Sequence, residues 1–241
     1  MKNKYISFLT LLLVVTELLS AQENSITIKE FAAILNASKN AQILDARSPE
    51  EFAVNHIKGA INVDLKDAAG SEKIISSLNP KYPTFSYSIN NGRSSALAKK
   101  LREKGFEKVY ELPGGLGNWV GAGYPLLSFY NKGLAISSKQ YQELIQSKEL
   151  VLVDVGSKYC GGCRKLVPVL DSLDNYRASN LRIVRIEFDN NPELVKEQEI
   201  KALPTLKLYK NGQEVWFNKG HIVYQQLLSI IQQKGNLLTI K

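Results

Sequence analysis

Cysteine and histidine are both scarce in this chain, with two of each among 241 residues. Two cysteines are too few for a small scaffold held together by disulfides. Sixteen glycines and eight prolines are too few for a collagen-like or low-complexity chain. The chain is instead 44% hydrophobic and 22% charged, as globular proteins usually are. Its length suggests one large or two modest domains, each able to bury a core.

Charge of one sign is not concentrated anywhere along the chain. The formal net charge is +8, yet the basic and acidic residues are interspersed and no run of five Lys or Arg occurs. Nucleic-acid-binding proteins gather basic side chains into a patch or stripe. We therefore predict a mixed, solvated surface and no nucleic-acid partner.

The first 21 residues predict a secretory signal peptide. Lys2 and Lys4 give a positive start, Tyr5–Val15 is an apolar run, and Ala21 offers a small residue for cleavage. An uncleaved membrane anchor is the alternative, but the uncharged run of about a dozen residues is shorter than the roughly 20 that span a bilayer. We therefore expect a periplasmic or secreted protein that keeps no stable membrane span after the signal is removed.

The segment after the signal peptide, residues 22–127, alternates short apolar runs with helical stretches. Ser48-Pro49-Glu50-Glu51 has the pattern of a capping box that opens a helix, and Gly105 follows a helix over Ser94–Lys104. Strands separated by helices predict a mostly parallel sheet covered on both faces. The predicted strands are 41–45, 84–88 and 109–112.

A second α/β unit follows a segment rich in Gly, Pro and aromatic residues at 121–133. We place a linker at 128–136 and a second domain at 137–241, so that the predicted fold class is α/β with two domains. Asn211-Gly212 is the typical turn of a β-hairpin. The predicted helices are 138–147, 163–173, 192–198 and 222–234, and the predicted strands are 150–155, 181–188, 205–209 and 214–217.

Both cysteines lie in one motif, Cys160-Gly161-Gly162-Cys163, which follows an apolar strand and opens a helix. Two thiols at this spacing can close a disulfide, and the positive end of the helix lowers the pKa of the first thiol. A zinc site would need two more ligands, and His56 and His221 are the only histidines. We therefore expect no metal. A purely structural disulfide would close too short a loop to add much stability.

The region from about residue 135 to 236 resembles a thioredoxin domain. Besides the cysteine motif, the resemblance lies in the strand Leu152–Val155, in Pro168 within the helix, in Ala202–Thr205 and in the turn Lys210–Gly212. Two positions depart from the family pattern. Tyr159 stands where the family has Trp, and Gly162 stands where it has Pro between the cysteines.

The resemblance implies thiol–disulfide exchange without a cofactor. Cys160 attacks a substrate disulfide, and Cys163, the less exposed thiol, resolves the mixed disulfide. Asp154 is then the buried carboxyl that handles the proton of Cys163, and Pro204 is the cis-proline that shapes a groove for an extended substrate segment. The implied partners are protein dithiols or disulfides and an unknown redox partner. The family leaves open whether this chain oxidises, reduces or isomerises.

Residues from about 25 to 127 resemble a single-domain rhodanese. The resemblance lies in Leu44–Arg47, Glu50–Phe52, His56–Asn62 and Gly114-Gly115 with Trp119. The family's active loop begins with a persulfide-carrying cysteine and ends at Arg-Ser. In this chain the loop contains Ser88, Asn91, Arg93 and Ser94.

A serine at position 88 changes the chemistry of that loop, because a hydroxyl forms no persulfide and is a poor nucleophile without a base. The resemblance therefore implies a domain that is silent in sulfur transfer and serves in binding or recognition. Whether its backbone amides and Arg93 still hold an anion stays open, and Asn91 stands where a glycine with positive φ is expected. Two alternatives to an oxidoreductase also stay open. One is a persulfide carrier using Cys160, and the other is a binding protein with a permanent disulfide.

Overall fold

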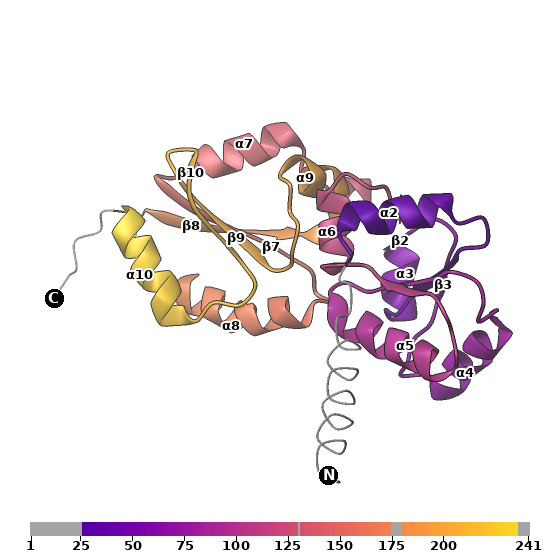
Figure 1. Ribbon diagram of the computed structural model, residues 1–241. Coiled ribbons are helices and arrows are strands. Elements are labelled where there is room, and N and C mark those ends of the chain that lie inside the picture. Colours follow the sequence, from indigo (N-terminus) through magenta and orange to yellow (C-terminus); the bar gives the residue numbers. More distant parts are fainter. Residues whose placement is uncertain (1–25, 130, 175–179, 236–241) are drawn as a thin grey trace, which may run out of the picture.

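The computed structural model describes residues 26–129, 131–174 and 180–235. The chain forms two α/β lobes that lie side by side, the first indigo to magenta and the second orange to yellow (Figure 1). Each lobe has its own four-stranded sheet, which confirms the predicted two-domain α/β class. In the described ranges no helix is both long and apolar enough to cross a membrane. The predicted signal peptide lies outside the described residues.

The first domain has a sheet in which every neighbouring pair of strands is parallel, as predicted. The strand order is β3-β1-β4-β5, with β1 and β4 in the centre. The strands are β1 (Gln42–Asp45), β3 (Ala60–Asn62), β4 (Thr84–Tyr87) and β5 (Val109–Glu111).

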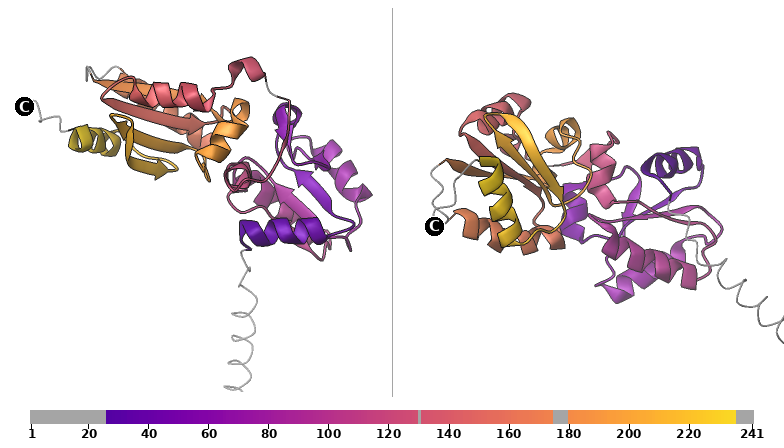
Figure 2. Two further views of the ribbon diagram at one scale, coloured as in Figure 1. Left: turned by 90° about the horizontal axis from the view of Figure 1, so that it is seen from above. Right: turned by 60° about the vertical axis from the view of Figure 1, so that its left-hand side comes forward.

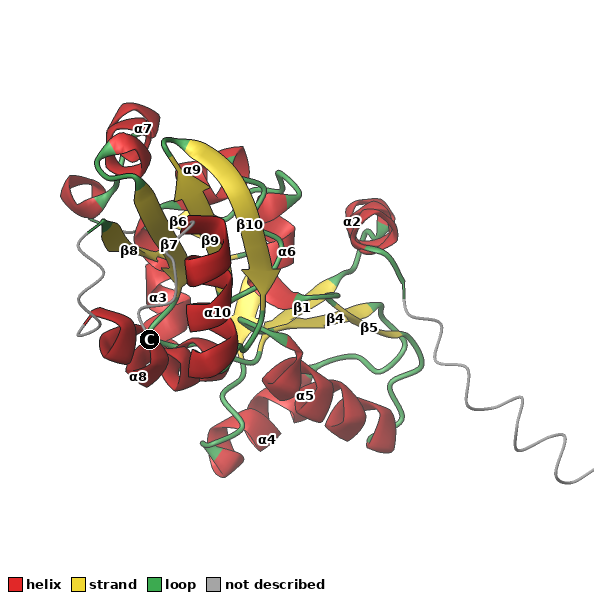
Figure 3. Cartoon of the chain, turned by 90° about the vertical axis from the view of Figure 1, so that its left-hand side faces the viewer, coloured by secondary structure: helices red, strands yellow, loops and turns green. Residues whose placement is uncertain are grey.

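Helices cover both faces of this sheet (Figure 3). On one face Phe31 and Trp119 pack around Phe85, and on the other Leu97 packs near Leu44. One of the helices begins at the predicted capping box, where the Ser48 hydroxyl accepts a hydrogen bond from a backbone N–H. The helices are α2 (Ile28–Ala37), α3 (Pro49–Val54), α4 (Ala68–Ser77), α5 (Asn91–Glu103) and α6 (Gly115–Gly121).

The chain leaves the first domain through a short two-stranded pairing. β6 (Leu127–Ser128) pairs antiparallel with β2 (Asn55–His56), so the start of the junction still packs on the first domain. The His56 Nδ1 atom lies 2.8 Å from the carbonyl oxygen of Phe52, and its ring stacks on the Phe52 ring. The contacts of His56 are therefore those of a turn residue.

The second domain has a mixed sheet in the order β10-β9-β7-β8. β7 and β8 are parallel, whereas β9 runs antiparallel to β7 and pairs with β10 across the Asn211-Gly212 turn. Both turn residues have positive φ, as this type of hairpin turn requires. The strands are β7 (Leu150–Gly156), β8 (Leu181–Glu187), β9 (Thr205–Lys210) and β10 (Gln213–Lys219).

The central strand β7 is buried on both faces, and its side chains alternate between two sets of helices. Leu150 and Leu152 pack with α8 and α10, while Val151 and Val153 belong to the cluster that contains α7 and α9 residues. By this alternation Asp154 faces the α8 side of the sheet. The helices are α7 (Ser138–Gln146), α8 (Gly161–Asp174), α9 (Pro192–Glu197) and α10 (Tyr224–Gly235), with 3-10 turns η1 (Lys132–Leu134) and η2 (Phe188–Asn190).

The two domains lie against each other in both views of Figure 2, and α6 of the first domain contacts α9 of the second. α6 contributes three glycines to this contact region, and two of them lie against the second domain. A Cβ atom on Gly121 would be 2.2 Å from the carbonyl oxygen of Ile200, and one on Gly117 would be 3.4 Å from the Leu203 side chain. The backbones of the two domains therefore approach closely.

Candidate active site at the domain junction

The two cysteines lie where the sequence predicts them, at the beginning of a helix. Cys160 precedes α8, Cys163 lies in its first turn, and the two form a disulfide with Cα atoms 5.2 Å apart. The backbone N–H of Cys163 donates to the Sγ atom of Cys160 over 3.2 Å. Negative charge on the Cys160 sulfur would thus meet both a direct donor and the positive end of the helix.

The exposure of the pair is the reverse of what the family resemblance implies. Cys160 is 0% exposed and Cys163 is 7% exposed, so the expectation that Cys163 is the less accessible thiol is wrong for this structure. The physical reason is the first domain. Its loop between β4 and α5 packs over Cys160, and a single sequence gives no signal for this docking.

Asn90 makes the contact between that loop and the cysteine. Its Nδ2 atom lies 3.5 Å from the Sγ of Cys160 and 3.5 Å from the carbonyl oxygen of Leu203. The peptide bond from Leu203 to Pro204 is cis. A Cβ atom on Gly162 would be 3.2 Å from the Cδ of Pro204, so the proline lies directly beside the cysteine motif.

Asp154 lies on the other side of the cysteine pair. Burial raises the pKa of Asp154 to about 6, against the opposing effect of Arg185, whose guanidinium bonds Asp171 at 2.6 Å. Among the described residues the Oδ1 atom of Asp154 is buried without a hydrogen-bond partner. A Cβ atom on Gly156 would be 3.6 Å from the Cys163 sulfur and 3.7 Å from that Oδ1. Gly156 therefore leaves a gap that the thiol and the carboxyl share.

The loop of the first domain is folded in on itself. Ser88 is buried, its hydroxyl contacts the carbonyl oxygen of Asn90, and its oxygen accepts from the Ser94 N–H over 3.3 Å. Asn91 is the first residue of α5 and is not among the described residues with positive φ, so the predicted need for glycine there is wrong. Its side chain bonds the carbonyl of Leu112, on the first domain.

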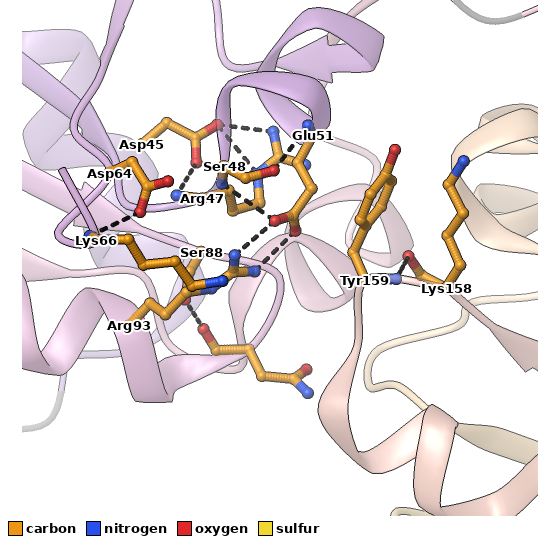
Figure 4. Close-up of polar contacts among 12 residues, drawn as sticks. Asp45, Arg47, Ser48, Glu51, Asp64, Lys66, Ser88, Arg93, Lys158 and Tyr159 are labelled. Carbon is orange, nitrogen blue, oxygen red and sulfur yellow. Dashed lines mark hydrogen bonds and ion pairs between the residues drawn. The ribbon is translucent and has the colours of Figure 1, made fainter.

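Arg93 does not point into the loop as an anion ligand would. Its guanidinium holds the buried carboxylate of Glu51 with two bonds of 2.5 and 2.7 Å (Figure 4). A bidentate pair of this kind satisfies both charges. The Ser88–Ser94 loop therefore has neither a thiol nor a free guanidinium.

A chain of buried polar groups crosses from one domain to the other. Arg47 pairs with Asp45 and also donates to Asn55, all within the first domain. The Asn55 side chain then donates to Asp189 of the second domain over 3.0 Å, and Asp189 accepts from Ser157 over 2.7 Å. Because these buried groups bond one another, the contact has a defined geometry rather than being an apolar patch.

A cavity of about 560 Å³ opens between the domains beside Asn90. Tyr159 lies on one side of it, across from Glu51 and Arg93 (Figure 4). Its lining comes from both domains and includes Ser88, Asn90, Arg93, Tyr159, Gly161 and Arg164. Within the described ranges no group of three His, Cys, Asp or Glu could hold a metal ion.

The structure thus brings Cys160, Cys163, Asp154 and Pro204 together, and it also brings the Ser88–Ser94 loop against them. Asn90, Asn55 and Asp189 also belong to this junction, and none of them lies in a motif that predicts a role. No local pattern could have identified these residues, because their partners lie 70 and 134 positions away along the chain.

Comparison with known families identifies two regions of similarity. The family model for thioredoxin matches residues 123–233, and the family model for the rhodanese-like domain matches residues 27–122. The two matches adjoin each other, and each contains the motifs that suggested the resemblance.

Several curated relatives are thioredoxins. The chain is 35% identical over 74 residues to thioredoxin 1 of Synechococcus elongatus, which is 31% of this chain and 69% of that protein. It is 32% identical over 97 residues to the thioredoxin of Rickettsia felis, covering 40% of this chain and 83% of that one. Among solved structures, a thioredoxin mutant from Halobacterium salinarum is 23% identical with a TM-score of 0.39, covering 43% of this chain and 91% of its own.

Proposed function

Because this chain belongs to the thioredoxin family and is a thiol–disulfide oxidoreductase, we propose that it works outside the cytoplasm through Cys160 and Cys163. The thioredoxin domain implies protein disulfides as substrates. The rhodanese-like domain ahead of it has a binding or recognition role and transfers no sulfur.

The proposed reduction moves two electrons from the cysteine pair to the substrate. The Cys160 thiolate attacks one sulfur of a substrate disulfide, forms a mixed disulfide and releases one substrate thiolate. Cys163 gives its proton to the Asp154 carboxylate and attacks the Cys160 sulfur. The second substrate sulfur leaves as a thiolate, which takes up a proton from solvent, and the Cys160–Cys163 disulfide remains. Oxidation of a substrate dithiol follows the same steps in reverse.

The observation that carries this proposal is the placement of the cysteine pair between Pro204 and Asp154. The disulfide lies at a helix start, beside the cis peptide bond on one side and near an unpartnered buried carboxyl on the other. A structural disulfide requires neither neighbour. A carboxyl whose pKa is about 6 can change protonation near neutral pH, as a proton acceptor must.

Reduction of insulin disulfides, with dithiothreitol as the electron source, tests the function. The full chain should accelerate insulin precipitation. An unchanged rate, with a Cys160–Cys163 disulfide that resists dithiothreitol, would favour the binding protein with a permanent disulfide. Formation of thiocyanate from thiosulfate and cyanide, dependent on Cys160, would favour the persulfide carrier.

Position 88 allows a direct test of the silent first domain. In a C160S/C163S background, S88C restores a thiol to the loop, and we expect thiocyanate formation to stay at the background rate. Position 88 is 1% exposed and Arg93 is bound to Glu51, so the thiol would be shielded and without a free cationic partner. Thiosulfate turnover is measured by the colour of the ferric thiocyanate complex.

The matched control for S88C is the same double mutant with Ser88 unchanged. Turnover in that control would refute the proposal that the domain is silent. Turnover only after S88C would instead show that the loop still cradles an anion and lacks nothing but its nucleophile.

Export gives a separate expected result. Protein purified from the envelope or medium of an expressing bacterium should begin at or near Gln22, as read by intact-mass spectrometry, because residues 1–21 have the pattern of a cleaved signal. L12D, which places a charge in the apolar run, should leave full-length protein in the cytoplasm. Protein that retains Lys2 in the envelope fraction would contradict cleavage.

A further inference from the structure

The loop of the rhodanese-like domain occupies the place where a substrate of the thioredoxin domain would bind. An extended substrate pairs with the backbone beside the cis-proline while its sulfur meets Cys160. In this structure the Asn90 amide makes both contacts, since it lies 3.5 Å from the Leu203 carbonyl oxygen and 3.5 Å from the Cys160 sulfur. As a result Cys160 has no exposed surface.

The two domains also contact each other at points away from Asn90. The buried bond from Asn55 to Asp189 joins the domains at one point, and the backbone of α6 meets the segment 200–203 at another. A polypeptide can reach the Leu203 carbonyl only if the loop leaves, and the loop cannot leave without loosening these contacts. The access of a protein disulfide therefore depends on separation of the domains.

A small disulfide could reach the Cys160 sulfur without separation of the domains. The cavity of about 560 Å³ is within the size range of small-ligand sites and is lined by Asn90, whose Nδ2 atom lies 3.5 Å from the Cys160 sulfur. Rotation of that one side chain would connect the cavity to the sulfur. Lys66 and Arg164 line the cavity together with Glu50 and the Arg93–Glu51 pair, so its lining is polar and carries charges of both signs. Oxidised glutathione, a small disulfide that itself carries charges of both signs, is a suitable probe.

We propose that the Ser88–Ser94 loop forms a substrate filter for Cys160, together with the two contacts between the domains described above. With the domains together, the filter admits small disulfides through the cavity and excludes polypeptides. Protein disulfides react from the separated state. This inference rests on the proposed function and adds a selectivity, assigning to the first domain a role in choosing the substrate of the second.

Gly121 and Gly117 offer a matched pair of variants that test the filter in the full chain. G121A places a methyl group 2.2 Å from the backbone oxygen of Ile200, so the backbones of α6 and of Ile200, which belong to different domains, must move apart at this contact. G117A makes only an ordinary contact of 3.4 Å. Neither glycine has positive φ, so alanine suits both helical positions. The measurement is kcat/KM for insulin divided by kcat/KM for oxidised glutathione.

We expect G121A to raise that ratio about tenfold, because the rate with a protein follows the fraction of separated molecules. G117A should leave it at the parent value. An unchanged ratio in G121A would overturn the filter, and so would an equal rise for both disulfides. If the parent reduces neither disulfide, the proposed function fails, and that result differs from either of these.

A cross-link checks the docked loop independently of activity. On oxidation with diamide, which accepts the two electrons and two protons, N90C/C163S should form a disulfide between positions 90 and 160. N91C/C163S is the control, because the Asn91 side chain bonds Leu112 of its own domain. Peptide mass spectrometry identifies the product. Absence of the 90–160 link, or equal linking at 91, would contradict the docked loop.

Discussion

Replacing Cys160 with serine should lower insulin reduction by roughly 10³-fold or more, to the rate without protein, because the attacking sulfur is lost. A serine hydroxyl at the start of α8 keeps the helix and the groove but supplies no thiolate. The variant should still fold, since serine differs from cysteine by one atom and is of similar size. Insulin turbidity measures the loss, and circular dichroism of parent and variant checks the fold.

C163S should behave differently, because it keeps the attacking thiol and removes the resolving one. It should accumulate covalent adducts with its substrates, visible on non-reducing gels and released by dithiothreitol. The C160S variant is the matched control and should accumulate none. If C163S reduces insulin catalytically as well as the parent does, the two-thiol mechanism is wrong. If the adducts form on neither variant, Cys160 is not the nucleophile.

Local signals in the sequence predicted the α-helices and strands of the second domain within a few residues, but in the first domain they predicted only β1, α3, β4, α5 and β5. The Ser48 capping box marks the start of α3, and Asn211-Gly212 marks the hairpin between β9 and β10. These signals succeed because a cap or a tight turn depends on neighbouring residues alone. The start of α5 was predicted at Ser94, and the structure begins it at Asn91.

Other elements were not predicted, for different physical reasons. α2 carries a capping box of Thr27 with Glu30 that could have revealed it. α6 contains three glycines and has little intrinsic tendency to form a helix, so burial of Leu116 and Trp119 stabilises it. A contribution that comes from packing against distant residues has no local signature.

The residues of the active site also differ in whether a local motif predicts them. The cysteines, Asp154 and Pro204 could be identified from the sequence because each sits in a short motif of one domain. The covering of Cys160 could not, because it depends on how two domains dock. Close packing of α6 against the segment 200–203 requires Gly121, yet a single glycine in a sequence does not indicate which backbone approaches it.

Substitution of Asp154 should make the protein slower and more stable at the same time. Burial raises the pKa of this carboxyl from 3.8 to about 6, so the folded state disfavours its charged form. The free energy of unfolding is therefore highest below about pH 4 and declines as the pH rises through 6. D154N removes this charge and should gain about 2–3 kcal/mol at pH 8, at 1.36 kcal/mol per pKa unit, and nothing at pH 4.

Trp216 can report unfolding of the second domain alone if Trp119, the only other tryptophan, is replaced by phenylalanine in parent and variant. D174N is the control, since Asp174 is 57% exposed and its loss should change neither stability nor rate. A D154N protein that is no more stable at pH 8 than the parent would contradict the claim that burial raises the pKa of Asp154.

The catalytic effect of D154N should appear in the pH profile of insulin reduction. Above pH 6 the parent carboxylate can accept the proton of Cys163, and below pH 6 it is protonated, so the parent rate should fall with an apparent pKa of about 6. D154N should be about 100-fold slower than the parent at pH 7, because a general base typically contributes at least that factor to the rate. The fall in rate around pH 6 should be absent from its profile. If the rate of D154N still falls around pH 6, the titrating group is not Asp154.

Slow resolution should also lengthen the life of the mixed disulfide, so that D154N accumulates the same adducts as C163S, in smaller amounts.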